Sequence, residues 1–343
     1  MSQVDKLDEV KLASYLEANI DDFKGPLRAI EFPGGHSNPT FKIEAQSASY
    51  VLRRQPPGEL LKSAHAVDRE YRILKALANT DVPVAKVYHL CEDKEVIGSM
   101  FYIMEFCDGN IHWDAALKDI TSKEQRGKMY DEMNRVLAAI HSVDIEKAQL
   151  TDYGKPGNYF HRQFERWSTQ YKNSDLKPIP EMDELIDWLS DNLPDDDGKT
   201  SITHGDYRLD NVMFSKDDNK IIAVLDWELS TLGHPYADLA YQCMGLRLPS
   251  TDSSFTVSGL RGFDRQASGI PTEQEYVASY CERMGIEKID NWNFYLCFSF
   301  FRLAAISHGI AKRAADGNAS NKAASSIGAL AQPLAKLGTE IIN

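Results

Sequence analysis

The spacing of apolar residues changes from a strand-like to a helix-like period near residue 106, and this change limits the possible folds more than any other feature. Before it, short apolar runs separated by Pro, Gly and Asn predict five strands, at 27–32, 40–45, 49–55, 83–88 and 100–106. A helical period predicts one helix at 8–19 and another at 64–78. From residue 27 onward the predicted order is therefore β-β-β-α-β-β.

The chain after Gly109 is predicted to be mostly helical. Apolar residues at helical spacing predict helices at 123–141, 159–171, 181–192, 272–284 and 291–315. Two short apolar runs, 212–214 and 221–225, interrupt this pattern, and the polar stretch SKDDNK between them predicts a hairpin. Together these patterns predict an α+β fold with a small β-rich lobe at 1–106 and a larger helical lobe at 107–343.

Composition and charge restrict the class of partner. The chain has 343 residues, of which 43% are hydrophobic and 26% charged, values typical of globular proteins. Its 38 Lys and Arg against 51 Asp and Glu give a formal net charge of −13. Because binding to nucleic acid requires clustered basic side chains, we expect no nucleic-acid partner. The acidic balance fits a cationic substrate, or simply the solubilising surface of a cytosolic enzyme.

Cysteine usage and the apolar segments indicate a cellular location. Five scattered cysteines without a CxxC pair favour a reducing compartment and predict no structural zinc site. The first residues are charged and lack the apolar core of a signal peptide. The most apolar stretch, 294–310, contains Arg302 and His308 and is shorter than a membrane-spanning helix, so we expect a buried helix. The sequence therefore predicts a cytoplasmic protein with no membrane partner.

The segment HGDYRLDN at 204–211, followed after an apolar strand by DWE at 226–228, is the strongest functional signal. Phosphoryl transfer requires a carboxylate beside the acceptor hydroxyl and oxygen ligands that hold Mg²⁺ against the nucleotide phosphates. Asp206 would orient or deprotonate the hydroxyl, while Asn211 and Asp226 would bind Mg²⁺. Turn-capping Asp and Asn residues explain either motif alone, but not both in this order after a β-rich half. The sequence therefore predicts a phosphotransferase.

These motifs resemble the aminoglycoside phosphotransferase and choline kinase branch of the protein-kinase-like fold, in which HGDxxxxN and D-W-E replace HRDxxxxN and DFG. The likeness extends over nearly the whole chain. VLDWELSTLGHPYADLAY and FSFFRLAAISHGI are most similar to the kinase-like module fused to certain acyl-CoA dehydrogenases, and to free-standing bacterial proteins of that subgroup. The resemblance implies a two-lobed fold, ATP and Mg²⁺ as cofactors, a phosphate-binding loop in 1–106, and a catalytic loop and acceptor site in 107–343.

The resemblance implies a loop that covers the nucleotide phosphates. The turn-forming segment 32–41 contains the candidate residues, which are Gly34, Gly35, Ser37 and Asn38. Backbone N–H groups and the Ser37 hydroxyl can approach phosphate oxygens in such a loop. Because the segment lacks the GxGxxG pattern, an ordinary hairpin loop is the alternative.

Arg53 and Glu70 are implied to be the cation and carboxylate that position the nucleotide. Arg53 stands where protein kinases and aminoglycoside kinases use Lys, and its guanidinium can contact two phosphate oxygens at once. The adjacent Arg54 alternates to the other face of the strand, which makes a phosphate contact less expected. Glu70 matches the carboxylate that pairs with the cation. Without the resemblance it would be interpreted as a solvated residue on a helix face.

Further residues are implied to shape the site. Backbone groups of Glu105 and Cys107, at the end of the fifth strand, would bind the adenine edge. Asp238 resembles the buried Asp that anchors the catalytic loop by hydrogen bonds, and His204 would organise the same loop. Glu228 would assist metal binding or accept a loop N–H.

Two arginines have open roles. Arg208, inside the catalytic loop, would stabilise charge on the transferred group, contact an anionic substrate, or form an ion pair with Asp210 or Asp226. Arg302 lies in an apolar helix, and a buried guanidinium needs a partner. We expect Arg302 to hold a loop carboxylate or to face an anionic substrate group.

The leading hypothesis is an ATP- and Mg²⁺-dependent phosphotransferase that acts on a hydroxyl of a small molecule. A nucleotide-binding pseudokinase is an alternative, which the intact set of Asp206, Asn211 and Asp226 disfavours. A protein kinase is disfavoured because no APE-type segment follows Asp226. For the acceptor, the subgroup implies hydroxyacyl acids or their coenzyme A thioesters, with aminoglycosides and other alcohols as alternatives. The polar segment 246–270 either lines the acceptor site or is a surface loop.

Overall fold

The computed structural model describes residues 7–32, 38–56, 65–250, 259–317 and 324–343. The chain forms two compact units. The first consists of Met1–Gly109 and Ile222–Glu228, and the second of Asn110–Ile221 and Leu229–Asn343. The chain therefore returns to the first unit for one short segment, which the sequence-based division at 106 and 107 had assigned to the helical part.

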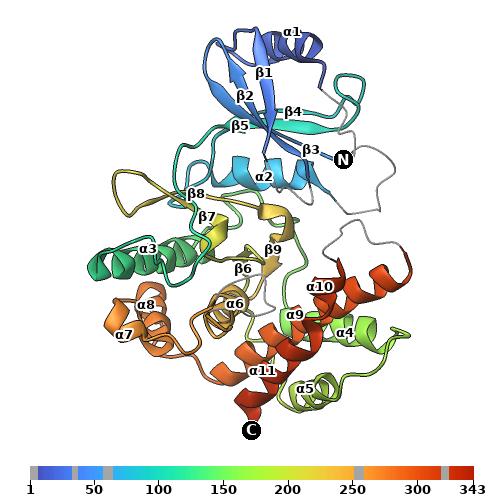
Figure 1. Ribbon diagram of the computed structural model, residues 1–343, viewed down its shortest axis with the longest axis vertical. Helices are drawn as coiled ribbons and strands as arrows, with labels where there is room; N and C mark the ends of the chain where they lie inside the picture. Colours follow the sequence, from blue (N-terminus) through green and yellow to red (C-terminus); the bar gives the residue numbers. More distant parts are fainter. Residues whose placement is uncertain (1–6, 33–37, 57–64, 251–258, 318–323) are drawn as a thin grey trace. The chain divides into compact units, whose positions relative to one another are not determined.

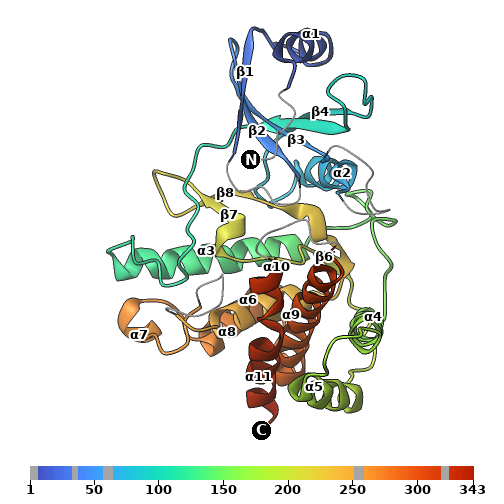
Figure 2. The same ribbon diagram turned by 45° about the vertical axis from the view of Figure 1, so that its right-hand side comes forward.

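The first unit is built on a five-stranded antiparallel sheet with the strand order β1-β2-β3-β5-β4. The strands are β1 (Leu27–Glu31), β2 (Thr40–Ala45), β3 (Ser49–Arg54), β4 (Val87–Cys91) and β5 (Phe101–Glu105). Two helices accompany the sheet, α1 (Glu9–Asn19) and α2 (Val67–Leu77). Figures 1 and 2 show α1 beside β1, and α2 beside β4 and β5. The predicted order β-β-β-α-β-β is confirmed.

Two apolar faces form the core of this unit. Leu12 and Leu16 of α1 are fully buried and pack in one cluster with sheet residues such as Ile43, Leu52 and Phe101. The side chain of Asp8 caps α1 by accepting the Lys11 N–H at 3.0 Å, a contact typical of a helix start. Burial of one face thus fixes the register of the central strands, and with it the direction of the polar residues on β3.

The prediction of a strand at 83–88 was wrong in position, because β4 begins at Val87. The Pro83 carbonyl accepts the N–H of Val224 at 2.8 Å, so this part of the chain pairs with the returning segment. The sheet pairing starts only at Lys86, whose carbonyl accepts the Glu105 N–H at 2.8 Å.

The second unit is mainly helical. Its helices are α3 (Lys123–His141), α4 (Tyr159–Lys172), α5 (Pro180–Asp191), α6 (Tyr236–Leu246), α7 (Arg265–Ser268), α8 (Glu273–Met284), α9 (Trp292–Ala315), α10 (Ala324–Gly328) and α11 (Ala331–Ile342).

Short strands β6 (Ser201–Thr203) and β9 (Thr231–Gly233) pair antiparallel. β7 (Val212–Phe214) and β8 (Ile221–Val224) follow the catalytic motif, and the Ser215 N–H closes the turn between them on the Lys220 carbonyl at 2.8 Å. The predicted strands at 212–214 and 221–225 are thus present.

α9 is the central helix of this unit. It packs against α4, α6, α10 and α11, as Figures 1 and 2 show. In the part of the chain that the structure describes, α9 is the one helix long and apolar enough to cross a membrane by length and composition. Its most apolar window is 67% buried inside the unit, which is the pattern of a core helix.

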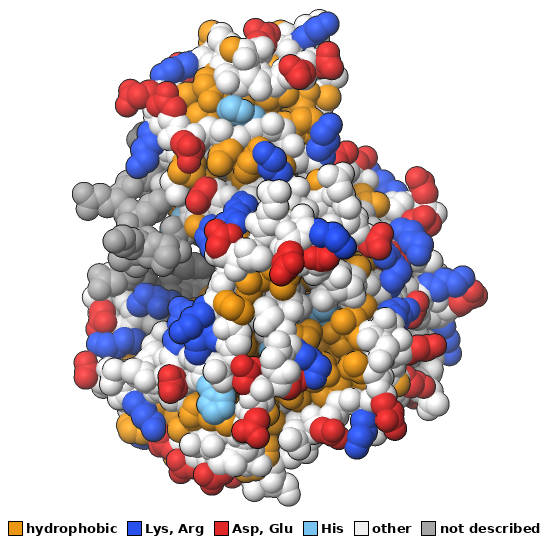
Figure 3. Space-filling model, turned by 180° about the vertical axis from the view of Figure 1, so that it is seen from behind, with side chains coloured by type: hydrophobic (Ala, Val, Ile, Leu, Met, Phe, Trp, Pro, Cys, Tyr) orange, Lys and Arg blue, Asp and Glu red, His pale blue; other side chains and the backbone are white. Residues whose placement is uncertain are grey.

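Charged side chains of both signs are mixed on the surface. On the face drawn in Figure 3, Lys and Arg alternate with Asp and Glu over each unit. On this face the acidic side chains are therefore mixed with basic ones rather than gathered into one acidic patch.

Candidate active site

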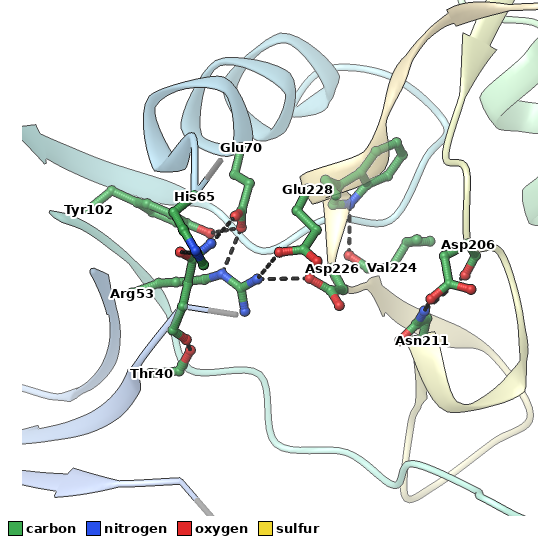
Figure 4. A network of polar contacts seen from close by, with 12 residues as sticks. Thr40, Arg53, His65, Glu70, Tyr102, Asp206, Asn211, Val224, Asp226 and Glu228 are labelled. Carbon is green, nitrogen blue, oxygen red and sulfur yellow. Dashed lines mark hydrogen bonds and ion pairs between the residues drawn. The ribbon is translucent and has the colours of Figure 1, made fainter. Parts of the chain in front are cut away.

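Arg53 on β3 joins three carboxylates of the first unit. Its Nε lies 2.7 Å from Oε2 of Glu70, which α2 supplies. Its Nη2 lies 2.8 Å from Oδ1 of Asp226 and 3.8 Å from Oε2 of Glu228, both on the returning segment (Figure 4). The predicted pairing of Arg53 with Glu70 is confirmed. The neighbouring Arg54 lies on the other strand face, where its Nε donates to Ser99 at 2.9 Å.

Glu70 is held rigidly because it is buried and bonded on both oxygens. Its exposed fraction is 2%. Oε1 accepts from Nδ2 of Asn38 at 2.8 Å, and Oε2 accepts from the hydroxyl of Tyr102 at 3.2 Å. Burial raises the pKa of Glu70, and the charge of Arg53 opposes that shift. Burial alone would lower the pKa of Arg53, but Glu70 and the other acidic neighbours raise it, so the guanidinium stays charged.

The candidate phosphate-binding loop is described only at its end. Gly34, Gly35 and Ser37 lie outside the described residues, and their contact with phosphate stays a prediction. The Asn38 side chain is buried and donates to Glu70, so it supports the Arg53–Glu70 pair. A nucleotide contact of Asn38 also stays a prediction.

Asp226 has an unusual backbone conformation. Its φ of 60° lies in the left-handed region, which costs free energy for residues other than Gly and is often retained at functional sites. The side chain is 39% exposed, and one of its oxygens contacts Arg53. Strand β8 and the turn after it thus present a partly exposed carboxylate beside the half-buried cation of Arg53.

The segment predicted to bind adenine lies at the end of β5. The N–H of Glu105 is already used, because it donates to the Lys86 carbonyl at 2.8 Å. Burial, and then the charge of Glu105, raise the pKa of the Cys107 thiol to about 11, so the thiol stays protonated. The adenine contacts of Glu105 and Cys107 stay predictions.

In the second unit, Asp238 on α6 anchors the catalytic loop. Its carboxylate accepts the backbone N–H of His204 at 2.6 Å and that of Gly205 at 2.9 Å. His141 Nε2 lies 3.4 Å from the same carboxylate. Burial alone would raise the pKa of Asp238, but His141, His204 and the Gly205 N–H together lower it. The predicted anchoring by Asp238 is confirmed.

The loop itself requires a glycine and a histidine. Gly205 has a φ of +87°, and a Cβ there would lie 2.8 Å from the Leu229 carbonyl oxygen. His204 is buried, and its Nδ1 accepts the backbone N–H of Asp206 at 3.3 Å. His204 therefore organises the loop, as the sequence predicts.

The loop presents the Asp206 carboxylate with a donor on each oxygen. Nδ2 of Asn211 donates to Oδ2 at 2.9 Å and to the Asp206 carbonyl at 2.8 Å (Figure 4). The hydroxyl of Tyr241 donates to Oδ1 at 2.7 Å. The Asp206 side chain is 22% exposed, so a small molecule can reach a carboxylate whose orientation is fixed.

Sequence reasoning missed Tyr241. It follows Asp238 by three residues on α6, so both side chains lie on the same helix face and reach the same loop. Burial, followed by the charge of Asp206, raises the pKa of Tyr241 far above its ordinary value, so the hydroxyl remains a donor. The spacing from Asp238 is the one signal in the sequence that could have indicated it.

Arg208 and Arg302, whose roles the sequence leaves open, both have contacts in the second unit. Nη2 of Arg208 lies 2.8 Å from Oδ2 of Asp210, and its Nε lies 3.6 Å from Oδ1 of Asp206. The ion pair with Asp210 was one of the predicted alternatives. Nη2 of Arg302 donates to the Gly205 carbonyl at 3.3 Å. Among the described residues Arg302 thus contacts a backbone oxygen of the catalytic loop, and the two predicted alternatives, a loop carboxylate or an anionic substrate group, stay predictions.

Asn211 and Asp226 have the chemistry of Mg²⁺ ligands. Nδ2 of Asn211 donates to Asp206, so its amide oxygen is the atom that would bind a metal ion, and this role stays a prediction. Asp226 supplies a partly exposed carboxylate. Within the described ranges, no group of three or more His, Cys, Asp or Glu side chains is arranged to hold a metal ion. Mg²⁺ commonly takes one or two protein oxygens together with substrate phosphates, so this small donor set fits the ion.

Comparison with known proteins identifies the class. The model of the phosphotransferase enzyme family matches residues 28–266, which is more than half of the chain. The chain belongs to this family, and its class is that of a phosphotransferase. The predicted resemblance to the aminoglycoside phosphotransferase branch is confirmed.

Three individual proteins illustrate what the chain is similar to within and beyond this family. The chain is 48% identical over 316 residues to acyl-CoA dehydrogenase family member 10 of Mus musculus, a match that covers 91% of this chain and 29% of that protein. The chain thus spans less than a third of that relative. A Ralstonia eutropha protein assigned to the aminoglycoside phosphotransferases has a crystal structure with a TM-score of 0.88 at 48% identity, covering 98% of each chain. Aminoglycoside phosphotransferase APH(4)-Ia, bound to ADP and hygromycin B, shares the fold at a TM-score of 0.62 and 14% identity, covering 97% of this chain and 98% of that one.

Proposed function

We propose that this protein transfers the γ-phosphoryl group of ATP, in the presence of Mg²⁺, to a hydroxyl of a small molecule. The observation that carries the proposal is the Asp206 carboxylate, which is partly exposed and oriented by Asn211 and Tyr241. A carboxylate held in this way can accept a hydrogen bond from an acceptor hydroxyl and align its oxygen. The ion pairs of Arg53 with Glu70 and Asp226 support nucleotide binding in the first unit, because they hold the guanidinium in place.

In the proposed reaction each of these residues has a separate role. The acceptor oxygen forms a bond to the γ-phosphorus, the bond to ADP breaks, and the hydroxyl proton leaves toward Asp206. Arg53, oriented by Glu70, contacts nucleotide phosphates. Mg²⁺, held by Asn211 and Asp226, would neutralise charge on the phosphates. Glu228 would support the site beside Asp226, while Asp238 and His204 keep the loop in place.

For the acceptor, we propose a hydroxyacyl acid or its coenzyme A thioester. The 48% identity to a protein named as an acyl-CoA dehydrogenase supports this class, because such proteins handle acyl groups. An aminoglycoside is the second candidate, supported by the equally similar Ralstonia protein and by the net charge of −13, which would attract a polycationic sugar.

The test is ATP turnover with Mg²⁺ against separate pools of hydroxyacyl acids, hydroxyacyl thioesters, aminoglycosides and choline-like alcohols. We expect ADP release that depends on a hydroxyacyl pool and falls at least 100-fold in Asp206→Ala, because the variant loses the group that aligns the hydroxyl. Turnover with aminoglycosides alone would overturn the acceptor class. A rise in melting temperature with ATP and Mg²⁺, without turnover on any pool, would instead favour a pseudokinase.

We also propose a cytoplasmic location. All five cysteines lie in described parts of the chain and are free thiols, and four of them are buried. Free thiols in this number are typical of a reducing compartment.

A further inference from the structure

An apolar pocket of about 140 Å³ lies in the second unit beside the catalytic loop. Its walls are mainly aliphatic side chains, among them Met244, Leu246, Leu248, Leu303, Leu330 and Leu334. Trp113 also lines the pocket but is 73% exposed, which places its indole at the edge. Apolar cavities of this size bind hydrocarbons in preference to water.

The pocket is connected to Asp206 through residues that line it. Tyr241 lines the pocket and donates its hydroxyl to Oδ1 of Asp206 at 2.7 Å. Arg208 and Asp210 line it as well, paired with each other at 2.8 Å. These three polar side chains link the pocket to Asp206, which does not itself line it, and apart from Gln242 and Ser307 the other lining residues are apolar. A ligand with a hydroxyl at one end and an aliphatic chain at the other matches this distribution.

Gly245 keeps part of this space open. It follows Tyr241 by four residues on α6, so both residues lie on the helix face that borders the pocket. A Cβ built on Gly245 would meet no atom of the described residues within 4 Å, and its backbone is not in the left-handed region. Glycine destabilises a helix relative to alanine. Neither close packing nor backbone conformation requires glycine here, so the free space is available to a ligand.

We propose that this pocket binds the straight aliphatic chain of the acceptor, and that Gly245 sets the longest chain that fits. The inference rests on the proposed function, because it takes Asp206 as the group that meets the acceptor hydroxyl. A dry cavity of about 150 Å³ holds a molecule the size of benzene, so this pocket accommodates about six carbon atoms. A polycationic sugar has no such hydrocarbon segment and would leave the pocket unfilled.

The experiment measures kcat/KM for straight-chain hydroxyacyl acceptors that differ only in the number of carbons beyond the hydroxyl. For the wild type we expect a rise of about fourfold per added methylene, ending near six carbons. Gly245→Leu places four side-chain carbons in the same space and should move the optimum to chains about three or four carbons shorter. Gly245→Ala should shift it by about one carbon. An unchanged profile in a folded Gly245→Leu protein would overturn the inference.

A matched control and a binding measurement separate this inference from the proposed function. Lys336→Leu adds the same side chain at an exposed position of α11 outside the pocket, and should keep the wild-type profile. Independently of turnover, straight-chain alcohols should change the tryptophan fluorescence of the wild type. Affinity should rise about fourfold per methylene to about six carbons. The signal should be lost in Trp113→Phe, and the affinity for hexanol should fall at least tenfold in Gly245→Leu.

These experiments distinguish a failure of the proposed function from a failure of the inference about the pocket. Alcohol binding without any ATP turnover would refute the proposed function and keep an aliphatic ligand for the pocket. Turnover without dependence on chain length, or the lack of both turnover and alcohol binding, would overturn the inference.

Discussion

Asp206 illustrates what can be predicted for a single residue. Its spacing from Asn211 belongs to a motif, so the sequence indicates both residues, but the hydrogen bond between them is known only from the structure. The second donor, Tyr241, lies 35 residues further along the chain, and its contact depends on how α6 packs beside the loop. Packing of this kind leaves no local pattern, which is why the sequence indicates Asp206 and Asn211 but not Tyr241.

Tyr241→Phe tests the role of that second donor. The variant keeps the ring and removes a hydrogen bond to a charged group, so we expect kcat to fall about tenfold. The KM for ATP should stay within about twofold, because Tyr241 lies in the unit that lacks Arg53 and Glu70. Steady-state kinetics with the best acceptor measures both values.

Tyr153→Phe is the matched control for this substitution. Tyr153 is also buried, and its hydroxyl lies 2.7 Å from that of Ser230, without a contact to Asp206. The Tyr153→Phe variant should have a lower free energy of unfolding and an unchanged kcat. Equal losses of kcat in the two variants would show that Tyr241 acts only through stability.

At the scale of helices and strands, an element could be predicted where its apolar residues follow an amphipathic pattern. α3 was predicted with its observed bounds, because its apolar residues follow a clear helical period. α6 was missed because nearly all of its residues are buried, which leaves no polar face. α11 was missed because Pro333 and Gly338 are typical helix breakers, although Pro333 lies in the first turn, where proline is tolerated.

The turn that carries the catalytic loop gives a prediction about stability. In Gly205→Ala, the new Cβ would need a left-handed backbone and would lie 2.8 Å from the Leu229 carbonyl oxygen. We expect a loss of about 2 kcal/mol or more in the free energy of unfolding. Gly198→Ala is the control, because Gly198 also has a positive φ but no atom from the described parts of the chain lies within 4 Å of its Cβ position. Urea unfolding should show the larger loss for Gly205→Ala, and equal losses would contradict the close approach to Leu229.

For the whole molecule, the α+β class and the change from strands to helices could be predicted. The return of Ile222–Glu228 to the first unit could not, because it depends on a contact between segments distant in sequence, from Val224 to Pro83. That return has a functional consequence, since it brings Asp226 to Arg53 within one unit. The motif predicts Asp226 as a metal ligand, which stays a prediction, whereas its ion pair with Arg53 could not be predicted from the sequence.

The stability of the molecule should depend on pH through His234. Burial lowers the pKa of His234 to about 4, against the opposing effect of Asp197, and Lys199 and His141 also face it. Its Nδ1 accepts the Tyr236 N–H at 3.2 Å, which suits the neutral ring. The unfolded chain therefore binds the proton more tightly, and the free energy of unfolding should fall as the pH decreases from about 6.5 toward 4.

Urea unfolding at several pH values measures this effect. The contribution of His234 to the slope is at most about 1.4 kcal/mol per pH unit. His234→Gln should show a shallower decrease than the wild type across the same range. Identical slopes in the two proteins would contradict a buried, neutral His234.

The most direct test of the central claim is to follow the phosphoryl group itself by ³¹P NMR, with ATP, Mg²⁺ and a straight-chain hydroxyacyl acceptor. The account predicts a phosphate-ester signal that grows as ADP forms and that is lost in Asp206→Asn, which keeps the shape of the side chain but not its charge. ADP formation with inorganic phosphate as the only other product would contradict it. An ester signal that is equally strong in Asp206→Asn would also contradict it.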